Sequence, residues 1–147
     1  MGFAIRRATY EDKSDWLRMR QGLWPEAPIE YLALDLDRWL ADPNCAVFVV
    51  TGADEGPVAF LEAGLRDHAE GCETSPVGYI EAWYVEEHSR GQNLGKELIH
   101  AAEGWAREKG CAEMASDTWL ENEAGIAAHL KLGYYEIGRL VHFVKRL

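Results

Sequence analysis

The sequence lacks any apolar run close to the roughly 20 residues that a membrane-spanning helix needs. Its first residues, Met1–Arg7, show no apolar core followed by a small-residue cleavage site, so they do not resemble a secretory signal. Linkers rich in Gly and Ser, internal repeats and low-complexity blocks are also absent, while 48% of the residues are hydrophobic. We therefore expect a cytoplasmic protein without a membrane partner, folded as a single domain over residues 1–147.

Cysteine is scarce in the chain. Cys45, Cys72 and Cys111 are odd in number and far apart, with no C-x-x-C pair, which argues against a disulfide framework and a zinc knuckle. We expect reduced thiols that are either buried or on the surface. His68 shares a loop with Cys72, but two such ligands do not make a metal site, so no metal is expected.

Basic residues are also in deficit. The chain has 15 Lys and Arg against 25 Asp and Glu, which gives a formal net charge of −10. The phosphates of nucleic acid would be repelled, so no nucleic-acid partner is expected. A cationic small molecule would be attracted, although an acidic surface also serves solubility alone.

Hydrophobic periodicity and turn residues divide the chain into alternating strands and helices. Strands are expected over residues 3–8, 46–51, 58–65, 77–85 and 111–117, with one or two more within 134–147. Helices are expected over residues 9–24, 29–40, 94–109 and 121–132. This order predicts an α+β (mixed α/β) fold with a mixed, mostly antiparallel sheet. The central strand-helix-strand unit should form a parallel right-handed crossover, a junction that ligands favour.

The sharpest motif is Arg90-Gly91-Gln92-Asn93-Leu94-Gly95-Lys96, between the predicted central strand and the helix after it. The first N–H groups of a helix are unpaired and its dipole favours anions, so this turn can hold a pyrophosphate. Arg90 and Lys96 add positive charge, while Gly91 and Gly95 let the backbone approach a ligand closely. An ordinary charged turn that begins a helix is the alternative.

Glu81 is the lone carboxylate inside the predicted central strand, Val77–Val85. A charge in such a strand is costly unless it is paired or used. Its side chain is expected to share a face with Tyr79 and Trp83. A desolvated carboxylate there can take a proton from an ammonium group, directly or through water. The alternative is a structural carboxylate paired with an arginine.

The motif that begins at Arg90 resembles the acetyl-CoA motif Q/R-x-x-G-x-G/A of the Gcn5-related N-acetyltransferase (GNAT) family. Asn93 stands where the family usually has its first Gly, and Asn is the residue other than Gly that best tolerates positive φ, so the loop should keep its shape. A second stretch resembles the family spacing N-x-x-A-x-x-x-Y-x-x-x-G-F through Asn122, Gly125, His129 and Gly133-Tyr134. The resemblance implies a GNAT fold and an acetyltransferase that uses acetyl-CoA as cosubstrate.

The same resemblance implies roles for single residues. The family Asn, here Asn122, binds the pantetheine arm of the coenzyme, and the end of the central strand gives it backbone hydrogen bonds. His129 replaces a family Tyr that can protonate the departing thiolate, so it is a candidate general acid near neutral pH; a packed or surface His is equally open. The expected cofactor-binding residues are Tyr84, Val85, Arg90, Gly91, Gln92, Asn93, Gly95, Lys96 and Asn122.

A narrower resemblance, over nearly the whole chain, is to aminoglycoside 6′-N-acetyltransferases of the chromosomal, dimeric subgroup. It is carried by three stretches: Leu23-Trp24-Pro25, Thr74–Glu81 and Glu113–Thr118. It implies that Glu81 and Asp117 contact amines of the drug and that Trp24 lines the pocket. Carboxylates at the ends of adjacent strands suit a polycation. Asp117 could instead cap the next helix.

Two departures from the subgroup bear on drug spectrum. The loop over residues 66–73 lacks its Tyr-Val-Asn stretch, and Gly138 stands where relatives can carry an acidic side chain. Subgroup relatives use a strand like the one expected at residues 139–146 at a dimer interface, which implies a homodimer. A plain edge strand, blunted by Lys145 and Arg146, is the alternative.

These patterns together lead us to expect direct transfer of an acetyl group from acetyl-CoA to the 6′-amine of an aminoglycoside. Glu81 would be the base, His129 or water the acid, and N–H groups near Val85 would polarise the thioester. Two alternatives stay open: a GNAT enzyme for another amine, such as a polyamine, a protein N-terminus or a lysine, and a non-catalytic module that binds acetyl-CoA.

Overall fold

The computed structural model describes residues 2–147, which form two compact units. The first unit extends to Ser116 and the second runs from Asp117 to Leu147. In the first unit a five-stranded sheet has the spatial order β1 (Ala4–Arg7), β2 (Cys45–Thr51), β3 (Pro57–Arg66), β4 (Val77–Val85) and β5 (Met114–Ser116). Its helical segments are η1 (Tyr10–Asp12), α1 (Lys13–Leu23), α2 (Ile29–Ala33), α3 (Leu36–Ala41), η2 (Glu87–Ser89) and α4 (Leu94–Glu108).

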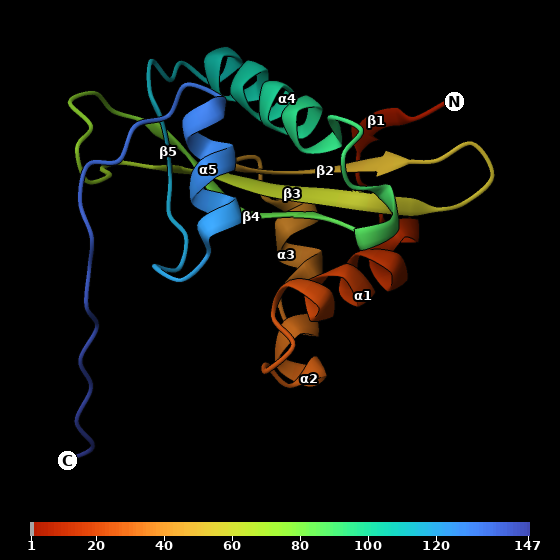
Figure 1. Cartoon of the computed structure of the whole chain (residues 1–147), viewed down its shortest axis with the longest axis horizontal. Helices are drawn as coiled ribbons and strands as arrows, with labels where there is room; N and C mark the ends of the chain where they lie inside the picture. The colour runs from red at the N-terminus through yellow and green to blue at the C-terminus, as the bar shows by residue number, and fades with distance from the viewer. Residues whose placement is uncertain (1) are drawn as a thin grey trace. The chain divides into compact units, whose positions relative to one another are not determined.

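The sheet of the first unit is mixed, as predicted. Strands β1 to β4 are antiparallel neighbours, whereas β4 and β5 run parallel and are joined through α4. Helix α4 packs against one face, and α1 and α3 pack against the other (Figure 1). Both faces are therefore covered, which explains why β2 and most of β3 are buried along their length.

The helix expected over residues 29–40 is wrong in one respect, because it is broken into α2 and α3. The break falls at Asp35, whose φ of −113° is not helical. Its carboxylate accepts hydrogen bonds from Arg20 Nη1 at 2.8 Å and Trp39 Nε1 at 3.2 Å. Asp is a weak helix former in a helix interior, and here its side chain instead links α3 to Arg20 of α1, which is consistent with the break.

A β-bulge in β4 was not anticipated. Glu62 of β3 pairs with Ala82, and Ala63 pairs with Ile80, so Glu81 is the extra residue on β4. The bulge resets the alternation of side chains along the strand. Glu81 stays with Tyr79, but Trp83 is turned towards α4, so the expectation that all three share a face is wrong for Trp83.

The second unit contains α5 (Glu123–Lys131), and Gly133, with φ of +95°, follows the end of the helix. The strands expected within residues 134–147 are not formed, because this segment has no regular secondary structure. Its apolar side chains are strongly exposed, with Phe143 at 93% and Val144 at 96%. A strand needs a partner edge, and among the described residues this segment pairs with none.

Two expected absences can be compared with the described residues. None of the described helices has the length and hydropathy needed to cross a bilayer. Within residues 2–147 no group of three or more His, Cys, Asp or Glu side chains is arranged to hold a metal ion.

Candidate active site

The loop before α4 exposes backbone N–H groups. Gly91 and Asn93 both have left-handed backbones, with φ of +82° and +63°, so the predicted tolerance of Asn93 for positive φ is confirmed. Asn93 occupies the N-cap position of α4 but makes no side-chain cap hydrogen bond. The helix begins its backbone bonding only at Glu97 N, which donates to Asn93 O at 3.1 Å. The amides of Leu94–Lys96 therefore lack acceptors within the helix, and the turn is suited to an anion.

Positive charge lies beside this turn. Arg90 is docked on the end of β4, where its Nε donates to Val85 O at 2.8 Å and its guanidinium stands 5.6 Å from the ring centroid of Tyr84. Lys96 is exposed on the first turn of α4. The structure thus brings the end of the central strand and the charged turn together.

Next to the turn, β4 leaves one edge open within the first unit. β5 pairs with β4 only at Gly78, Tyr79 and Ile80, so residues 81–85 have no strand partner on that side. The parallel pairing of β4 with β5 thus ends at Ile80. An open edge offers backbone N–H and C=O groups to an extended ligand, which is the requirement for binding an amide-containing arm such as pantetheine.

Glu81 does not have the desolvated environment that its sequence context predicted. Its side chain keeps 30% of its accessible surface and forms an ion pair with Arg66. Arg66 donates three hydrogen bonds to it: Nε to Oε2 at 3.0 Å, and Nη2 to Oε1 at 2.9 Å and to Oε2 at 2.8 Å. The alternative, a carboxylate paired with an arginine, is the arrangement found. This exposure fits the position of Glu81, which lies one residue beyond Ile80, where the pairing of β4 with β5 ends.

Trp24 follows α1 directly and is half-buried against the core cluster that includes Trp16 and Phe60. The guanidinium of Arg20 lies between two indoles, 5.1 Å from the ring centroid of Trp16 and 5.9 Å from that of Trp24. The expected pocket residue is therefore held in place by a buried cation that sequence reasoning did not identify.

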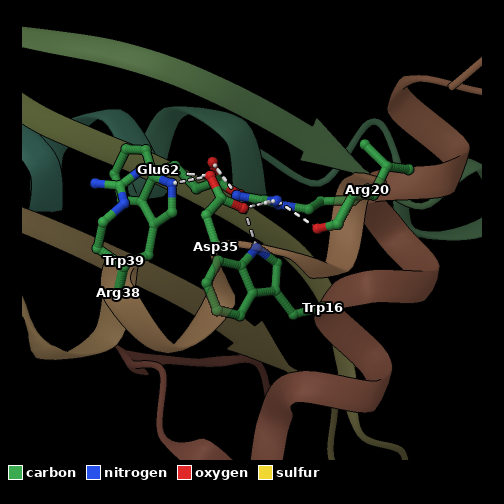
Figure 2. Close-up of polar contacts among 7 residues, drawn as sticks. Trp16, Arg20, Asp35, Arg38, Trp39 and Glu62 are labelled. Atoms are coloured by element: carbon green, nitrogen blue, oxygen red, sulfur yellow. Dashed lines mark hydrogen bonds and ion pairs between the residues drawn. The ribbon is translucent and has the colours of Figure 1, made fainter. Parts of the chain in front are cut away.

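Arg20 belongs to a buried polar network that joins α1 and the α2–α3 break to β3 (Figure 2). Its partner Glu62 is 2% exposed and accepts from Arg20 Nε at 2.7 Å, Arg20 Nη2 at 3.0 Å and Trp16 Nε1 at 2.8 Å. Arg20 Nη1 also donates to Leu32 O at 2.7 Å and to Asp35. Burial raises the pKa of the Glu62 carboxyl, and the donors from Arg20 and Trp16 act in the opposite direction.

A sequence signal for this network was present. Glu62 is the lone carboxylate of the expected strand at residues 58–65, just as Glu81 is in the next strand. The criterion that selected Glu81 applies equally to Glu62, and Glu62 is the one that is desolvated. Only the bulge and the position of Arg20, which the sequence pattern does not give, separate the two.

Two predicted site residues of the second unit surround the start of α5. Asn122 caps the helix: its Oδ1 accepts from Gly125 N at 3.0 Å and its Nδ2 donates to Thr118 Oγ1 at 2.8 Å. Asp117 is exposed and precedes this cap. The reading of Asp117 as the cap of the next helix is therefore wrong, because Asn122 has that role.

His129 lies on α5 and is half-buried. Its Nδ1 is 2.6 Å from Gly125 O, and its ring meets that of Tyr134 edge-on at 5.9 Å between centroids. Because a carbonyl oxygen only accepts, Nδ1 carries a hydrogen. The neutral ring then has an unprotonated Nε2, so His129 can deliver a proton from Nε2 only in its imidazolium form.

Comparison with known proteins decides the family. The model of the acetyltransferase (GNAT) family matches residues 14–134, which include most of the first unit and all of α5. The chain belongs to the GNAT acetyltransferase family. The match crosses the boundary between the two units, and it covers both the α4 turn and Asn122 of this GNAT chain.

Curated GNAT relatives are similar over nearly their whole length. An aminoglycoside N(6′)-acetyltransferase type 1 from Stenotrophomonas maltophilia is 42% identical over 142 residues, which cover 95% of this chain and 90% of the relative. The enzyme of the same name from Klebsiella aerogenes is 36% identical, with 97% and 96% covered.

Solved structures agree with this GNAT fold. The aminoglycoside acetyltransferase AAC(6′)-Iy, in complex with the bisubstrate analogue CoA-S-monomethyl-acetylneamine, has a TM-score of 0.92 and 32% identity, with all of both chains covered. AAC(6′)-Ih from Acinetobacter baumannii has a TM-score of 0.90 and 29% identity, with 99% of both chains covered.

Proposed function

We propose that the chain is an acetyl-CoA-dependent N-acetyltransferase that modifies the 6′-amine of aminoglycoside antibiotics and thereby confers resistance. The observation that carries the chemistry is the uncapped, left-handed turn at the start of α4, beside the open edge of β4. The acceptor is supported by the names of relatives that share 36–42% of their residues with almost the entire chain.

Acetyl-CoA fits the first unit as follows. The backbone of the α4 turn, with the charges of Arg90 and Lys96, takes the diphosphate. The contributing residues of this turn are Arg90, Gly91, Gln92, Asn93, Gly95 and Lys96. The pantetheine arm lies along the open edge of β4 that ends at Tyr84 and Val85. Asn122, which matches the Asn of the family motif, is the further residue that we assign to this arm. We thus propose that both units act as one domain over residues 1–147.

The acceptor side uses Trp24, Glu81 and Asp117. Asp117 and Glu81 bind ammonium groups, and Trp24 lines the pocket. Once the ion pair with Arg66 has opened, the carboxylate of Glu81 removes a proton from the 6′-ammonium. The free amine attacks the thioester carbon, polarised by N–H groups near Val85, so that a C–N bond forms and the C–S bond breaks. The departing thiolate takes a proton from the imidazolium of His129 or from water.

Assembly and location complete the proposal. The apolar side chains of the C-terminal segment are exposed in the single chain, which supports a homodimer formed through this region. They are Tyr135, Ile137, Leu140, Val141, Phe143, Val144 and Leu147. We place the enzyme in the cytoplasm, where acetyl-CoA is available. Analytical ultracentrifugation tests the dimer: replacing Phe143 and Val144 with Glu should give a monomer, and an unchanged mass would reject this interface.

Thiol release from acetyl-CoA with kanamycin or tobramycin as acceptor tests the function. Turnover should require the drug, and product analysis should place the acetyl group on the 6′-nitrogen. A Glu81→Gln variant should lose activity across the pH range, and full activity of this variant would reject Glu81 as the base. Turnover with polyamines or peptides but with no aminoglycoside would reject the acceptor, and coenzyme binding without any turnover would indicate a non-catalytic module.

A further inference from the structure

Arg66 forms an ion pair with the carboxylate of Glu81 from the far end of the neighbouring strand. It is the last residue of β3, and its partner in the ladder is Val77 at the start of β4. Its side chain runs along β4 over the ring of Tyr79, with the guanidinium carbon 3.4 Å from the ring centroid, to reach Glu81. Both carboxylate oxygens accept from the guanidinium. Arg66 therefore stands at the carboxylate that the proposed function assigns to an acceptor ammonium.

The ion pair between Arg66 and Glu81 is exposed enough for a ligand cation to replace Arg66. The side chains of Arg66 and Glu81 are 42% and 30% exposed, and ion pairs in such surroundings are weak because water competes for both partners. The neighbouring strand carries a useful contrast: Arg20 and Glu62 are 4% and 2% exposed. Arg20 is also held by Leu32 O and Asp35, so its pair with Glu62 is locked. Of these two Arg–Glu pairs, only the pair at Glu81 can open to a ligand.

We propose that Arg66 is a specificity-determining residue, an internal cation that holds Glu81 in the resting enzyme and must be displaced by the acceptor ammonium. This inference rests on the proposed function. A site that is open for only part of the time binds its ligand more weakly by that fraction. An acceptor must therefore gain affinity elsewhere, as a polycation does through its other ammonium groups, and simple monoamines are disfavoured. The chain itself thus sets a threshold for its acceptor.

Removing the competing cation should tighten acceptor binding. In Arg66→Gln we expect the Kd for tobramycin, measured calorimetrically with saturating coenzyme A, to fall about fivefold, which corresponds to about 1 kcal/mol. The KM for tobramycin should fall in parallel, while the KM for acetyl-CoA stays unchanged. Arg66→Lys keeps the charge but cannot form the bidentate contact, so its Kd for tobramycin should lie between those of wild type and Arg66→Gln. Arg107→Gln, the same charge change at an exposed position of α4, should behave as wild type.

The outcomes separate the inference from the function beneath it. Tobramycin binding to wild type with an equal or weaker affinity in Arg66→Gln overturns the role of Arg66 and leaves the proposed function standing. If neither protein binds any aminoglycoside, the proposed function fails and the inference fails with it. A purely structural Arg66 would lower thermal stability in Arg66→Gln and Arg66→Lys without tightening the acceptor, and this result also overturns the proposal.

Discussion

The indole N–H of Trp83 donates a hydrogen bond to the carbonyl oxygen of Gly95 at 3.1 Å, which ties the end of β4 to the first turn of α4. The contact is close enough that a β-carbon on Gly95 would lie 3.1 Å from Cζ2 and 3.2 Å from Nε1 of the indole. Gly at this position therefore permits the helix N-terminus to approach the open strand edge. The relative position of the two proposed coenzyme contacts depends on this pair.

Gly95→Ala should weaken the binding of acetyl-CoA. The added methyl group forces Trp83 or the first turn of α4 to shift, which moves the backbone amides that we assign to the diphosphate. We expect the KM for acetyl-CoA to rise roughly tenfold, because small misplacements of binding groups are costly, with little change in the KM for the acceptor.

Gly104→Ala is the matched control, because Gly104 lies in the same helix and a β-carbon there meets nothing within 4 Å. It should leave both KM values unchanged and stabilise the protein by about 0.5–1 kcal/mol, since Gly is unfavourable inside a helix. Equal effects of the two substitutions on the KM for acetyl-CoA would contradict the assignment of the turn.

Removing one partner of the Arg20–Glu62 pair should destabilise the protein strongly. Replacing both partners with apolar residues should destabilise it much less. Arg20→Met leaves a buried carboxylate without its cation, which should lower the free energy of unfolding by about 3–5 kcal/mol. Combining it with Glu62→Leu removes the unpaired charge, so the double variant should be more stable than Arg20→Met alone. Urea denaturation of four proteins, wild type, Arg20→Met, Glu62→Leu and the double variant, measures this; additive losses would show that the two side chains do not act as a pair.

Asp12 should make the free energy of unfolding depend on pH in the acid range. Arg6 donates two hydrogen bonds to its carboxylate, at 2.7 and 2.9 Å, and Thr9 N donates a third at 2.7 Å. These contacts, the first of them largest, lower the pKa of Asp12 in the folded protein despite opposing desolvation. The unfolded chain therefore takes up the proton first as pH falls. The contribution is complete above the unfolded pKa of about 3.9 and is lost as pH falls through the folded value.

Asp12→Asn should accordingly lose about 1.5–3 kcal/mol of stability near pH 7, a typical value for hydrogen bonds to a charged group. The difference from wild type should shrink below about pH 4. Asp37→Asn is the control, because Asp37 forms an exposed surface pair with Lys13 and should matter little. A difference between Asp12→Asn and wild type that stays constant from pH 7 to about pH 3 would refute the linkage to Asp12.

The three thiols should react with alkylating agents in a fixed order. Burial, with the nearby negative charge of Asp42, raises the pKa of Cys45 to about 11, and burial also raises the pKa of Cys111. Burial and the nearby charge of Glu113 also raise the pKa of Cys72, but its thiol is only half-buried in the loop after β3, whereas the other two are buried, so it should react first. Mass spectrometry after brief iodoacetamide treatment of the native protein should find one modified thiol, and Cys72→Ser should abolish it. Modification of Cys45 before Cys72 would contradict the burial.

The sequence predicted the elements that depend on local pattern. The positive φ of Asn93 and the parallel pairing of β4 with β5 follow from residue preference and apolar periodicity, and the structure confirms both. Those signals lie within one contiguous stretch of chain, Val77 to Ser116, so no long-range information was needed.

What the sequence missed depends on contacts between distant segments. The bulge at Glu81 and its pairing with Arg66 arise from how β3 and β4 register, and the choice of Glu62 as the buried carboxylate depends on where α1 places Arg20. The prediction of strands within residues 134–147 was wrong for a related reason. Alternation of apolar and polar residues is typical of a strand, but a strand forms only where another strand offers an edge to pair with.

The central claim is that the start of α4 binds the diphosphate of acetyl-CoA and so directs the thioester towards an amine. Calorimetric titration with acetyl-CoA, beside S-acetyl-pantetheine, which lacks the diphosphate, tests it most directly. We predict one binding site per chain for acetyl-CoA and an affinity for the truncated thioester that is lower by at least about two orders of magnitude, since several charge-assisted contacts are lost. Equal affinities for the two thioesters, or no heat with acetyl-CoA, would contradict the account.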